Sequence, residues 1–294
     1  MPIRLNLPET FAARLTRADR PQIGLWVCSG SPLMAELVAG SGVDWVLVDG
    51  EHSPNSLESI LAQLYAMSGY PVAPLVRVPT GDAVIIKQVL DLGAQNLIVP
   101  MVDSAAQAEE VVRAVHYPPR GVRGVGASLA RSSRWNRVPG YLANASSTVS
   151  LTVQIESAAA VAAVDEIVAV DGVDAIFIGP ADLAASMGRL GEPSHPEVVE
   201  AVLTALRAAA AAGKPAGVNA FVPDEAERYL AEGAAFVAVG SDVSLVARAT
   251  EGLADRFVPS LSEGAAGAAG AAGAPGTPGA SSSPNAAGTP RASY

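Results

Sequence analysis

The sequence predicts a (β/α)8 barrel, and two features of its 294 residues support this prediction. Short apolar segments recur eight times along the chain, and longer segments of helical period separate most of them. Strands that are apolar along their whole length are typical of parallel sheets covered by helices. Eight such strands alternating with helices favour a closed barrel. A doubly wound open sheet is the alternative architecture.

An amphipathic segment at 10–17 comes before the first strand. We expect the strands at the apolar segments 23–28, 43–49, 72–78, 96–102, 151–156, 175–179, 216–221 and 236–240. We expect helices at 55–67, 82–92, 105–115, 158–168, 196–212 and 225–232. The fifth helix is well delimited, because Pro196 suits a first helical position and Gly213 suits the residue just past the end. Residues 116–150 are too long for an ordinary connection, and their Arg and Gly content indicates an ordered functional loop.

Composition and charge restrict the partners of this chain. A net charge of −10 argues against binding nucleic acid or an anionic membrane through a bulk basic field. No apolar run reaches the roughly 20 residues that a membrane-spanning helix needs. The single cysteine, Cys28, allows no internal disulfide, which is typical of a reducing compartment. With no signal-peptide pattern at the start, we expect a cytoplasmic enzyme.

The composition changes sharply near the end of the chain. From Gly264 onward the sequence contains Gly, Ala, Pro, Ser, Thr and Asn, with one Arg and a final Tyr. Such a segment buries too little apolar surface to offset the entropy of ordering it. We therefore expect a barrel over residues 1–258 and a disordered tail over residues 259–294.

Ionisable residues stand where predicted strands end, which is where barrel enzymes place their active sites. Asp49, Glu51 and His52 follow the second strand. Their alternative roles are a helix cap for Asp49 and solvated loop positions for the other two. Arg77 ends the third strand, where it either holds a carboxylate with its planar fork or lies on the helix-facing surface with its head in solvent.

Two further carboxylates follow neighbouring strands. Gln154 and Glu156 end the fifth strand on one face, because strand side chains alternate, and Asp182 follows the sixth strand. Carboxylates at adjacent strand ends are typical of a site for a hard divalent cation that leaves positions open for water and substrate. The alternatives are a helix cap for Asp182 and a surface loop for Glu156.

The two lysines of the chain argue against imine chemistry. A Schiff-base aldolase needs a lysine at the barrel mouth. Lys87 is expected in a helix and Lys214 at the opposite end of the barrel. Metal-assisted enolate chemistry, with a histidine that moves the proton, agrees with the remaining residues.

Several ordered motifs resemble the HpcH/HpaI aldolase family over residues 5–257. They include DWVLVDGEHSPN from Asp44, YPPRGVRGVG from Tyr117, VQIES from Val153 and FIGPADLAASMG from Phe177. The members of this family are (β/α)8 barrels and class II pyruvate aldolases, which depend on a divalent metal. The resemblance therefore implies this fold and this class of activity.

The resemblance also assigns a metal site and a substrate site. It implies that Glu156 and Asp182 bind Mg²⁺, Mn²⁺ or Co²⁺. Pyruvate, or the pyruvyl half of the substrate, would chelate the metal. Gln154 and the backbone of Ala181 would help to hold it.

The resemblance implies three catalytic residues. Arg77 would stabilise the enolate, and His52 would act as the general base with its basicity raised by Asp91. The implied reaction removes a proton from the C4 hydroxyl of a 4-hydroxy-2-oxo acid such as 4-hydroxy-2-oxoheptanedioate and breaks the C3–C4 bond. Its products are pyruvate and an aldehyde such as succinate semialdehyde.

Three other functions stay open from the sequence. Relatives cleave sugar-derived 2-keto-3-deoxy acids, and the wider superfamily contains lyases of acyl-CoA thioesters. A CoA lyase would need a basic groove, for which only the loop 120–137 offers arginines. A barrel that binds a keto acid without catalysis is the third alternative. The resemblance also implies a homo-oligomer, a hexamer built from trimers or dimers.

Overall fold

The computed structural model describes residues 3–259, and eight parallel strands in it form a closed barrel. The strands in chain order are β1 (Gln22–Val27), β2 (Trp45–Asp49), β3 (Ala73–Arg77), β4 (Asn96–Val99), β5 (Ser150–Ile155), β6 (Ala175–Ile178), β7 (Ala216–Asn219) and β8 (Phe236–Ser241). Each strand pairs with the next, and β8 pairs with β1 to close the ring. The predicted barrel is confirmed, and the open sheet is excluded.

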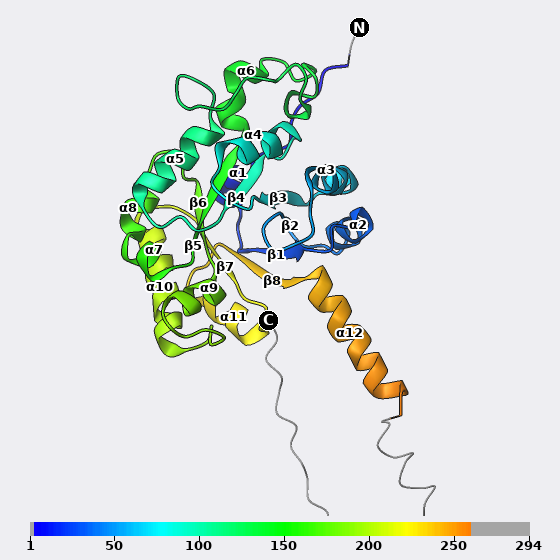
Figure 1. The fold of residues 1–294 in the computed structure, drawn as a ribbon, viewed down its shortest axis with the longest axis vertical. Coiled ribbons are helices and arrows are strands. Elements are labelled where there is room, and N and C mark those ends of the chain that lie inside the picture. The colour runs from blue at the N-terminus through cyan, green and yellow to red at the C-terminus, as the bar shows by residue number, and fades with distance from the viewer. Residues whose placement is uncertain (1–2, 260–294) are drawn as a thin grey trace, which may run out of the picture. The chain divides into compact units, whose positions relative to one another are not determined.

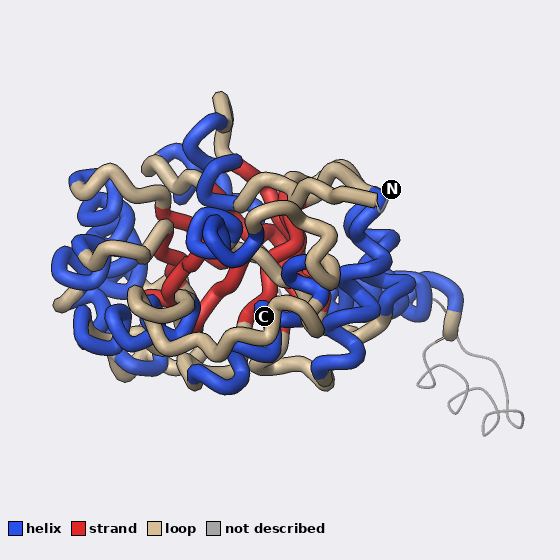
Figure 2. The backbone as a smooth tube through the Cα atoms, turned by 90° about the horizontal axis from the view of Figure 1, so that it is seen from above, coloured by secondary structure: helices blue, strands red, loops and turns tan. Residues whose placement is uncertain are grey.

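Helices follow the strands along the chain (Figure 1). They are α1 (Phe11–Arg17), α2 (Pro32–Ala39), α3 (Leu57–Ala66), α4 (Ala83–Asp91), α5 (Ala105–Val115), α6 (Tyr141–Asn144), α7 (Ala158–Ala162), α8 (Val164–Ala169), α9 (Pro180–Ser186), α10 (Pro196–Ala211), α11 (Pro223–Ala231) and α12 (Asp242–Phe257). Short 3₁₀ helices are η1 (Met67–Gly69), η2 (Arg131–Ser133) and η3 (Ala145–Thr148). Figure 2 shows the strands in the middle of the molecule with helices and loops around them.

Most predicted boundaries agree with the structure, and the differences have local causes. Strand β4 ends at Val99 because Pro100 has no N–H to donate and Met101 has a left-handed φ of 54°. The expected helix over 158–168 is two helices, which break at Ala163. Helix α2 was not predicted, although Ser31 caps it and Pro32 occupies its first turn. The long loop contains short helices and no ninth strand, as expected, and it ends where β5 begins at Ser150.

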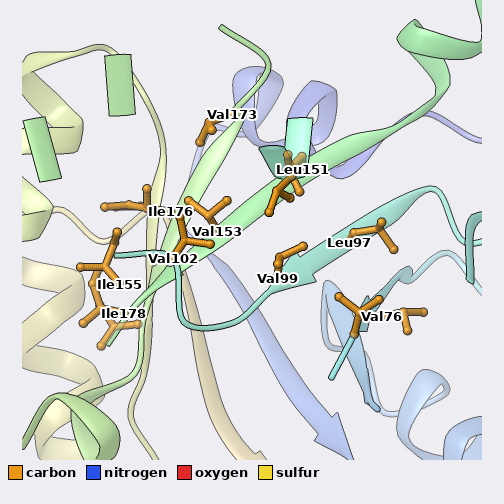
Figure 3. Packing of buried hydrophobic residues seen from close by; sticks show 14 of the residues in the cluster. Val76, Leu97, Val99, Val102, Leu151, Val153, Ile155, Val173, Ile176 and Ile178 are labelled. Carbon is orange, nitrogen blue, oxygen red and sulfur yellow. The ribbon is translucent and has the colours of Figure 1, made fainter. Parts of the chain in front are cut away.

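Alternation along each strand separates two apolar layers. Outward-facing side chains pack under the helices, and Figure 3 shows this packing for residues of β3, β4, β5 and β6 that include Val76, Val99 and Val153. Inward-facing side chains such as Trp45, Leu47 and Leu75 form a second cluster inside the barrel. Because side chains alternate, the last residues of β2 and β3 also face inward.

Helix α1 closes the end of the barrel where the strands begin. Phe11 at its start is buried, and its ring centroid lies 5.8 Å from Trp45 and 5.2 Å from Phe236. Trp45 and Phe236 are the first residues of β2 and β8. The start of the barrel is therefore filled with aromatic side chains, and polar groups gather at the other end.

The chain divides after Val243 into two compact units, so α12 is described by itself. Within this helix Arg248 pairs with Glu251 at 2.8 Å, and apolar side chains including Leu245, Leu253 and Phe257 are exposed. A disordered tail was predicted for 259–294. All of it except residue 259 lies outside the described residues. No helix in the range 3–259 is long and apolar enough to cross a membrane.

We predict that Leu75→Ala destabilises the barrel by about 2–5 kcal/mol, because it leaves a cavity in a fully buried apolar layer. Urea denaturation followed by circular dichroism measures this change. Leu33→Ala on α2 is the control, because the Leu33 side chain is 65% exposed. Equal loss of stability in both variants would contradict this description of the core.

Candidate active site

Polar side chains occupy the inward face of the barrel at the C-terminal ends of β2 and β3. Asp49 and Arg77 are neighbours in the sheet, and Nε of Arg77 donates a hydrogen bond of 2.8 Å to Oδ1 of Asp49. Gly50 lets the two strand ends approach each other, since a Cβ there would lie 2.6 Å from the carbonyl oxygen of Arg77. Its N–H donates to that same oxygen at 2.9 Å. The sheet register therefore places this ion pair inside the barrel mouth.

Asp49 also shapes the loop that follows it. Its carboxylate accepts hydrogen bonds from the backbone N–H of Glu51 and His52 and from the hydroxyl of Ser53. Burial by itself would raise the pKa of Asp49, but the hydrogen bond and charge of Arg77 and these donors hold the pKa below its usual range. Helix α3 is capped by Ser56, so the alternative role of Asp49 as a helix cap is wrong.

Arg77 is buried and connects several groups of the site. Its Nη1 lies 2.8 Å from Oε2 of Glu51 and 3.5 Å from Oε1 of Gln154. Its guanidinium carbon lies 4.3 Å from the centroid of the Trp26 ring. The side chain therefore points into the barrel mouth, and the alternative position on the helix-facing surface is wrong.

Glu156 is 2% exposed, so the alternative surface-loop position is also wrong. Its Oε1 accepts a hydrogen bond of 2.7 Å from the N–H of Met101, and its Oε2 accepts one of 2.7 Å from Nε2 of Gln154. Gln154 and Glu156 thus share a face, as their spacing predicted. Gly179 leaves room for this carboxylate, because a Cβ there would lie 2.8 Å from Oε2 of Glu156.

The contact from Met101 is the part of the site that sequence reasoning missed. Met101 has a left-handed φ of 54°, which is uncommon for a residue with a Cβ and turns its N–H toward Glu156. Pro100 before it signals the end of a strand. No pattern in the sequence indicates which carboxylate the following N–H contacts.

The electrostatics at Glu156 favour a bound cation. Burial first, and then the negative charges of Asp182 and Glu51, raise the pKa of Glu156 to about 7, although the N–H of Met101 and the charge of Arg77 act in the opposite direction. Burial likewise raises the pKa of Glu51. A positive ion beside these carboxylates would relieve both the desolvation and the mutual repulsion.

The donor set agrees with a hard divalent ion. Asp182 is exposed in the first turn of α9, which begins at Pro180 after Gly179 and has no side-chain cap, so the alternative of an N-cap is wrong. Glu156 and Asp182 offer oxygen atoms, which Mg²⁺ and similar ions prefer. Within residues 3–259 no group of three or more His, Cys, Asp or Glu side chains is arranged to hold a metal. If Glu156 and Asp182 are the two protein ligands, the other coordination positions are left to water and substrate.

His52 lies at the open rim of this site. Its side chain is 66% exposed, and its Nε2 lies 3.8 Å from Oε2 of Glu51. The exposure agrees with the alternative loop position, yet Glu51 links the imidazole to Arg77. We call the connected residues Asp49, Glu51, His52, Arg77, Gln154 and Glu156 the mouth network.

The structure does not bring Asp91 to His52 within one chain. Asp91 is the last residue of α4, which starts after the end of β3 and returns to the beginning of β4. It therefore lies toward the opposite end of the barrel from the loop that carries His52. There it accepts a hydrogen bond of 2.7 Å from Nη2 of Arg123, which is almost fully buried.

Neither lysine reaches the mouth network. Lys87 lies within α4, and Lys214 stands just before β7 with its ammonium group bonded to the carbonyl oxygen of Val173. Val173 comes just before β6, at the end of the barrel where the strands begin. These positions agree with the prediction that the barrel mouth has no lysine for imine catalysis.

Comparison with known proteins identifies relatives over most of the chain. Residues 22–249 match the family described as HpcH/HpaI aldolase/citrate lyase. A hydroxypyruvate/pyruvate aldolase of Deinococcus radiodurans is 53% identical over 87% of this chain and 92% of that protein. A 4-hydroxy-2-oxo-heptane-1,7-dioate aldolase of Escherichia coli is 51% identical over 85% and 95%. The crystal structure of a family protein from Burkholderia cenocepacia J2315 superposes with a TM-score of 0.81 at 37% identity, over 84% of this chain and 98% of that one.

We predict that Gly179→Ala lowers the affinity for Mn²⁺ by about 10- to 100-fold, because the added methyl group displaces the Glu156 carboxylate. Isothermal titration calorimetry measures the affinity. Gly69→Ala is the matched control, since a Cβ at Gly69 meets no atom within 4 Å. Unchanged affinity in a folded Gly179→Ala protein would rule out this packing role.

We also predict that the affinity for Mn²⁺ falls as the pH falls below about 7, the pKa of Glu156. The proton and the cation compete for the same carboxylate, so the affinity drops about tenfold per pH unit below that pKa and levels off above it. Titrations between pH 5.5 and 8.5 test this dependence. The Glu156→Gln variant should bind weakly at every pH, and a flat profile in the unmodified protein would refute the competition.

Proposed function

Because the chain belongs to the HpcH/HpaI aldolase/citrate lyase family, we propose that it is a divalent-metal-dependent pyruvate aldolase. It cleaves a 4-hydroxy-2-oxo acid to pyruvate and an aldehyde, and it catalyses the reverse addition. The observation that carries this proposal is the buried Glu156 carboxylate, whose pKa is raised beside Asp182 and which shares the barrel mouth with Arg77.

Glu156 and Asp182 would hold the metal ion. Their oxygen atoms suit Mg²⁺, Mn²⁺ or Co²⁺. When bound, the cation supplies Lewis-acid polarisation of the 2-oxo group and stabilises negative charge on its oxygen. The hydrogen bonds from Met101 and Gln154 would keep the Glu156 carboxylate in one orientation beside that ion.

The mouth network would position the substrate beside that ion. Gln154 lies between Arg77 and Glu156, and Ala181 is exposed next to Asp182 in the first turn of α9. The Arg77 guanidinium is already oriented by Asp49, so its charge needs little rearrangement to stabilise an enolate oxygen. Pre-oriented donors of this kind act more strongly in the transition state than in the ground state.

His52 would accept the proton of the C4 hydroxyl. The O–H electron pair becomes the new carbonyl of the aldehyde, the C3–C4 bond breaks, and its electrons form the enolate of pyruvate. Protonation of that enolate at C3 completes the cleavage. Glu51 is the carboxylate that the structure places beside His52, at 3.8 Å. An effect of Asp91 on His52, which the family resemblance implies, would need Asp91 from a second copy of the chain.

The substrate named for the Escherichia coli relative makes 4-hydroxy-2-oxoheptanedioate the first compound to assay, with succinate semialdehyde as the aldehyde product. The Deinococcus relative makes hydroxypyruvate a second donor to test besides pyruvate. Sugar-derived 2-keto-3-deoxy acids remain alternative substrates. The acyl-CoA lyase remains an alternative: in the long loop Arg120 and Arg123 are paired with Asp171 and Asp91, whereas Arg131 and Arg134 have no such partner among the described residues. A hexamer and a cytoplasmic location remain predictions.

We predict metal-dependent release of pyruvate that EDTA abolishes and Mg²⁺, Mn²⁺ or Co²⁺ restores. A lactate dehydrogenase assay coupled to cleavage of 4-hydroxy-2-oxoheptanedioate measures it. His52→Ala and Arg77→Ala should each lower turnover by about 100-fold or more, because each residue acts on the transition state.

His195→Ala serves as the control for His52→Ala. His195 caps α10, so its loss affects stability but should leave turnover near that of the unmodified enzyme. Turnover that persists in EDTA would exclude the metal-dependent mechanism. A His52→Ala protein that keeps full activity would remove the assigned base, and the absence of any turnover in the unmodified protein would favour a barrel that only binds a keto acid.

A further inference from the structure

A cavity lies at the end of the barrel where the strands begin, opposite the mouth network. Its volume is about 600 Å³, and its lining includes Ala73 and Asn96, the first residues of β3 and β4. The mouth network lies beyond the other ends of the same strands. The proposed aldolase reaction does not use this cavity.

Two arginines of the long loop line this cavity and lie side by side. Nη1 of Arg131 and Nη1 of Arg134 are each 2.8 Å from the point that a Cβ would occupy at Gly93. Nη1 of Arg131 donates to the carbonyl oxygen of Leu92, and Nη1 of Arg134 donates to that of Arg131. The Tyr65 side chain is a further hydrogen-bond partner of Arg131. Among the described residues no carboxylate lies within 4.0 Å of either guanidinium.

Two neighbouring arginines without a carboxylate partner are electrostatically unfavourable. Both side chains are half-buried, and burial lowers the pKa of each arginine. The charge of Arg131 lowers the pKa of Arg134 further. Buried like charges are normally compensated by a counter-charge, and the neighbouring Tyr65 ring, 4.5 Å from the Arg131 guanidinium, compensates only in part.

The backbone at this position is strained in the way that binding loops often are. Arg134, Trp135 and Asn136 have φ values of 52°, 55° and 62°, three consecutive left-handed residues that carry a Cβ. Each such residue costs of the order of 1–3 kcal/mol and persists where the surroundings enforce it. Gly93, at φ 92°, faces the two guanidinium groups without a side chain. The strained turn therefore holds the Arg134 guanidinium beside that of Arg131.

The remaining lining decides what kind of anion fits. Arg14 adds positive charge, although its guanidinium nitrogens already donate to the carbonyl oxygens of Asp44 and Pro71. Of the residues that the structure describes, Glu9 is the one acidic residue of the lining. It pairs with Arg14 and Arg17, and not with Arg131 or Arg134. The apolar part of the lining comprises Leu64, Met67, Val72, Ala73 and several prolines. The cavity thus combines a cationic end with an apolar wall.

We propose that this cavity binds an organic oxyanion, a carboxylate or a phosphate ester on an apolar body, whose charged group lies between Arg131 and Arg134. A guanidinium group is a planar fork of N–H donors, and such a fork can bind the oxygens of either a carboxylate or a phosphate. The apolar body packs against the wall that Leu64 and Met67 contribute. This is a binding site separate from the catalytic mouth.

The test measures binding of three probes to the full-length protein by isothermal titration calorimetry. Inorganic phosphate offers the oxyanion alone, phenyl phosphate adds an apolar body, and benzoate replaces phosphate with a carboxylate. We expect phenyl phosphate to bind more tightly than inorganic phosphate, and its comparison with benzoate shows which oxyanion is preferred. Arg134→Gln should weaken phenyl phosphate binding by about 10- to 100-fold, because it removes a charge-assisted hydrogen bond.

Matched variants separate this site from the rest of the protein. Arg134→Lys keeps the charge without the fork and should bind with intermediate affinity. Arg207→Gln, an exposed arginine on α10, should bind like the unmodified protein. Arg77→Ala changes the catalytic mouth and should leave phenyl phosphate binding intact. Circular dichroism verifies that each variant is folded.

Three results would overturn the proposal. The first is the absence of phenyl phosphate and benzoate binding to the unmodified protein. The second is loss of binding in Arg77→Ala with normal binding in Arg134→Gln, which would assign the anion to the catalytic mouth. The third is a crystal structure in which a carboxylate of a second copy of the chain occupies the space between Arg131 and Arg134. Aldolase activity is measured separately, so none of these results depends on it.

Discussion

The burial of one carboxylate, Glu156, sets the conditions that the rest of the site must meet. Its position at the end of β5 removes it from water, and the charges of Asp182 and Glu51 add to the cost of ionising it. Two hydrogen bonds, from Met101 and Gln154, offset part of that cost. The remainder is the electrostatic reason for the divalent cation that we propose at the mouth of this barrel.

Arg77 is the cation of this site, and its position is fixed by its own neighbours. Its guanidinium is the positive charge closest to these acids, and Asp49 and Glu51 hold it from one side while Gln154 meets it from the other. The same strands carry apolar side chains such as Leu75 one step further inside. The barrel thus keeps its stabilising layer and its reactive layer on the same inward face, two residues apart along the strand.

The strands and most residues of the site could be predicted because their signals are local. Apolar runs marked all eight strands, and the spacing of Gln154 and Glu156 fixed their common face. Met101 and Asp91 could not be placed that way. The contact of Met101 depends on a left-handed turn, and the position of Asp91 depends on the direction in which α4 runs. The neighbouring arginines Arg131 and Arg134 could not be predicted either, because the long loop has no hydrophobic periodicity.

The sequence by itself determined the barrel, the strand ends that carry ionisable groups and the chemical type of those groups. Continuous apolar runs and the residues that end them are local features of the sequence, so they can be identified without knowledge of the fold. Only the tertiary structure decided which groups touch: that Arg77 binds Asp49 and Glu51, and that Asp91 faces Arg123 rather than His52. Contacts between distant segments depend on closure of the ring and on sheet register, which local sequence patterns do not specify.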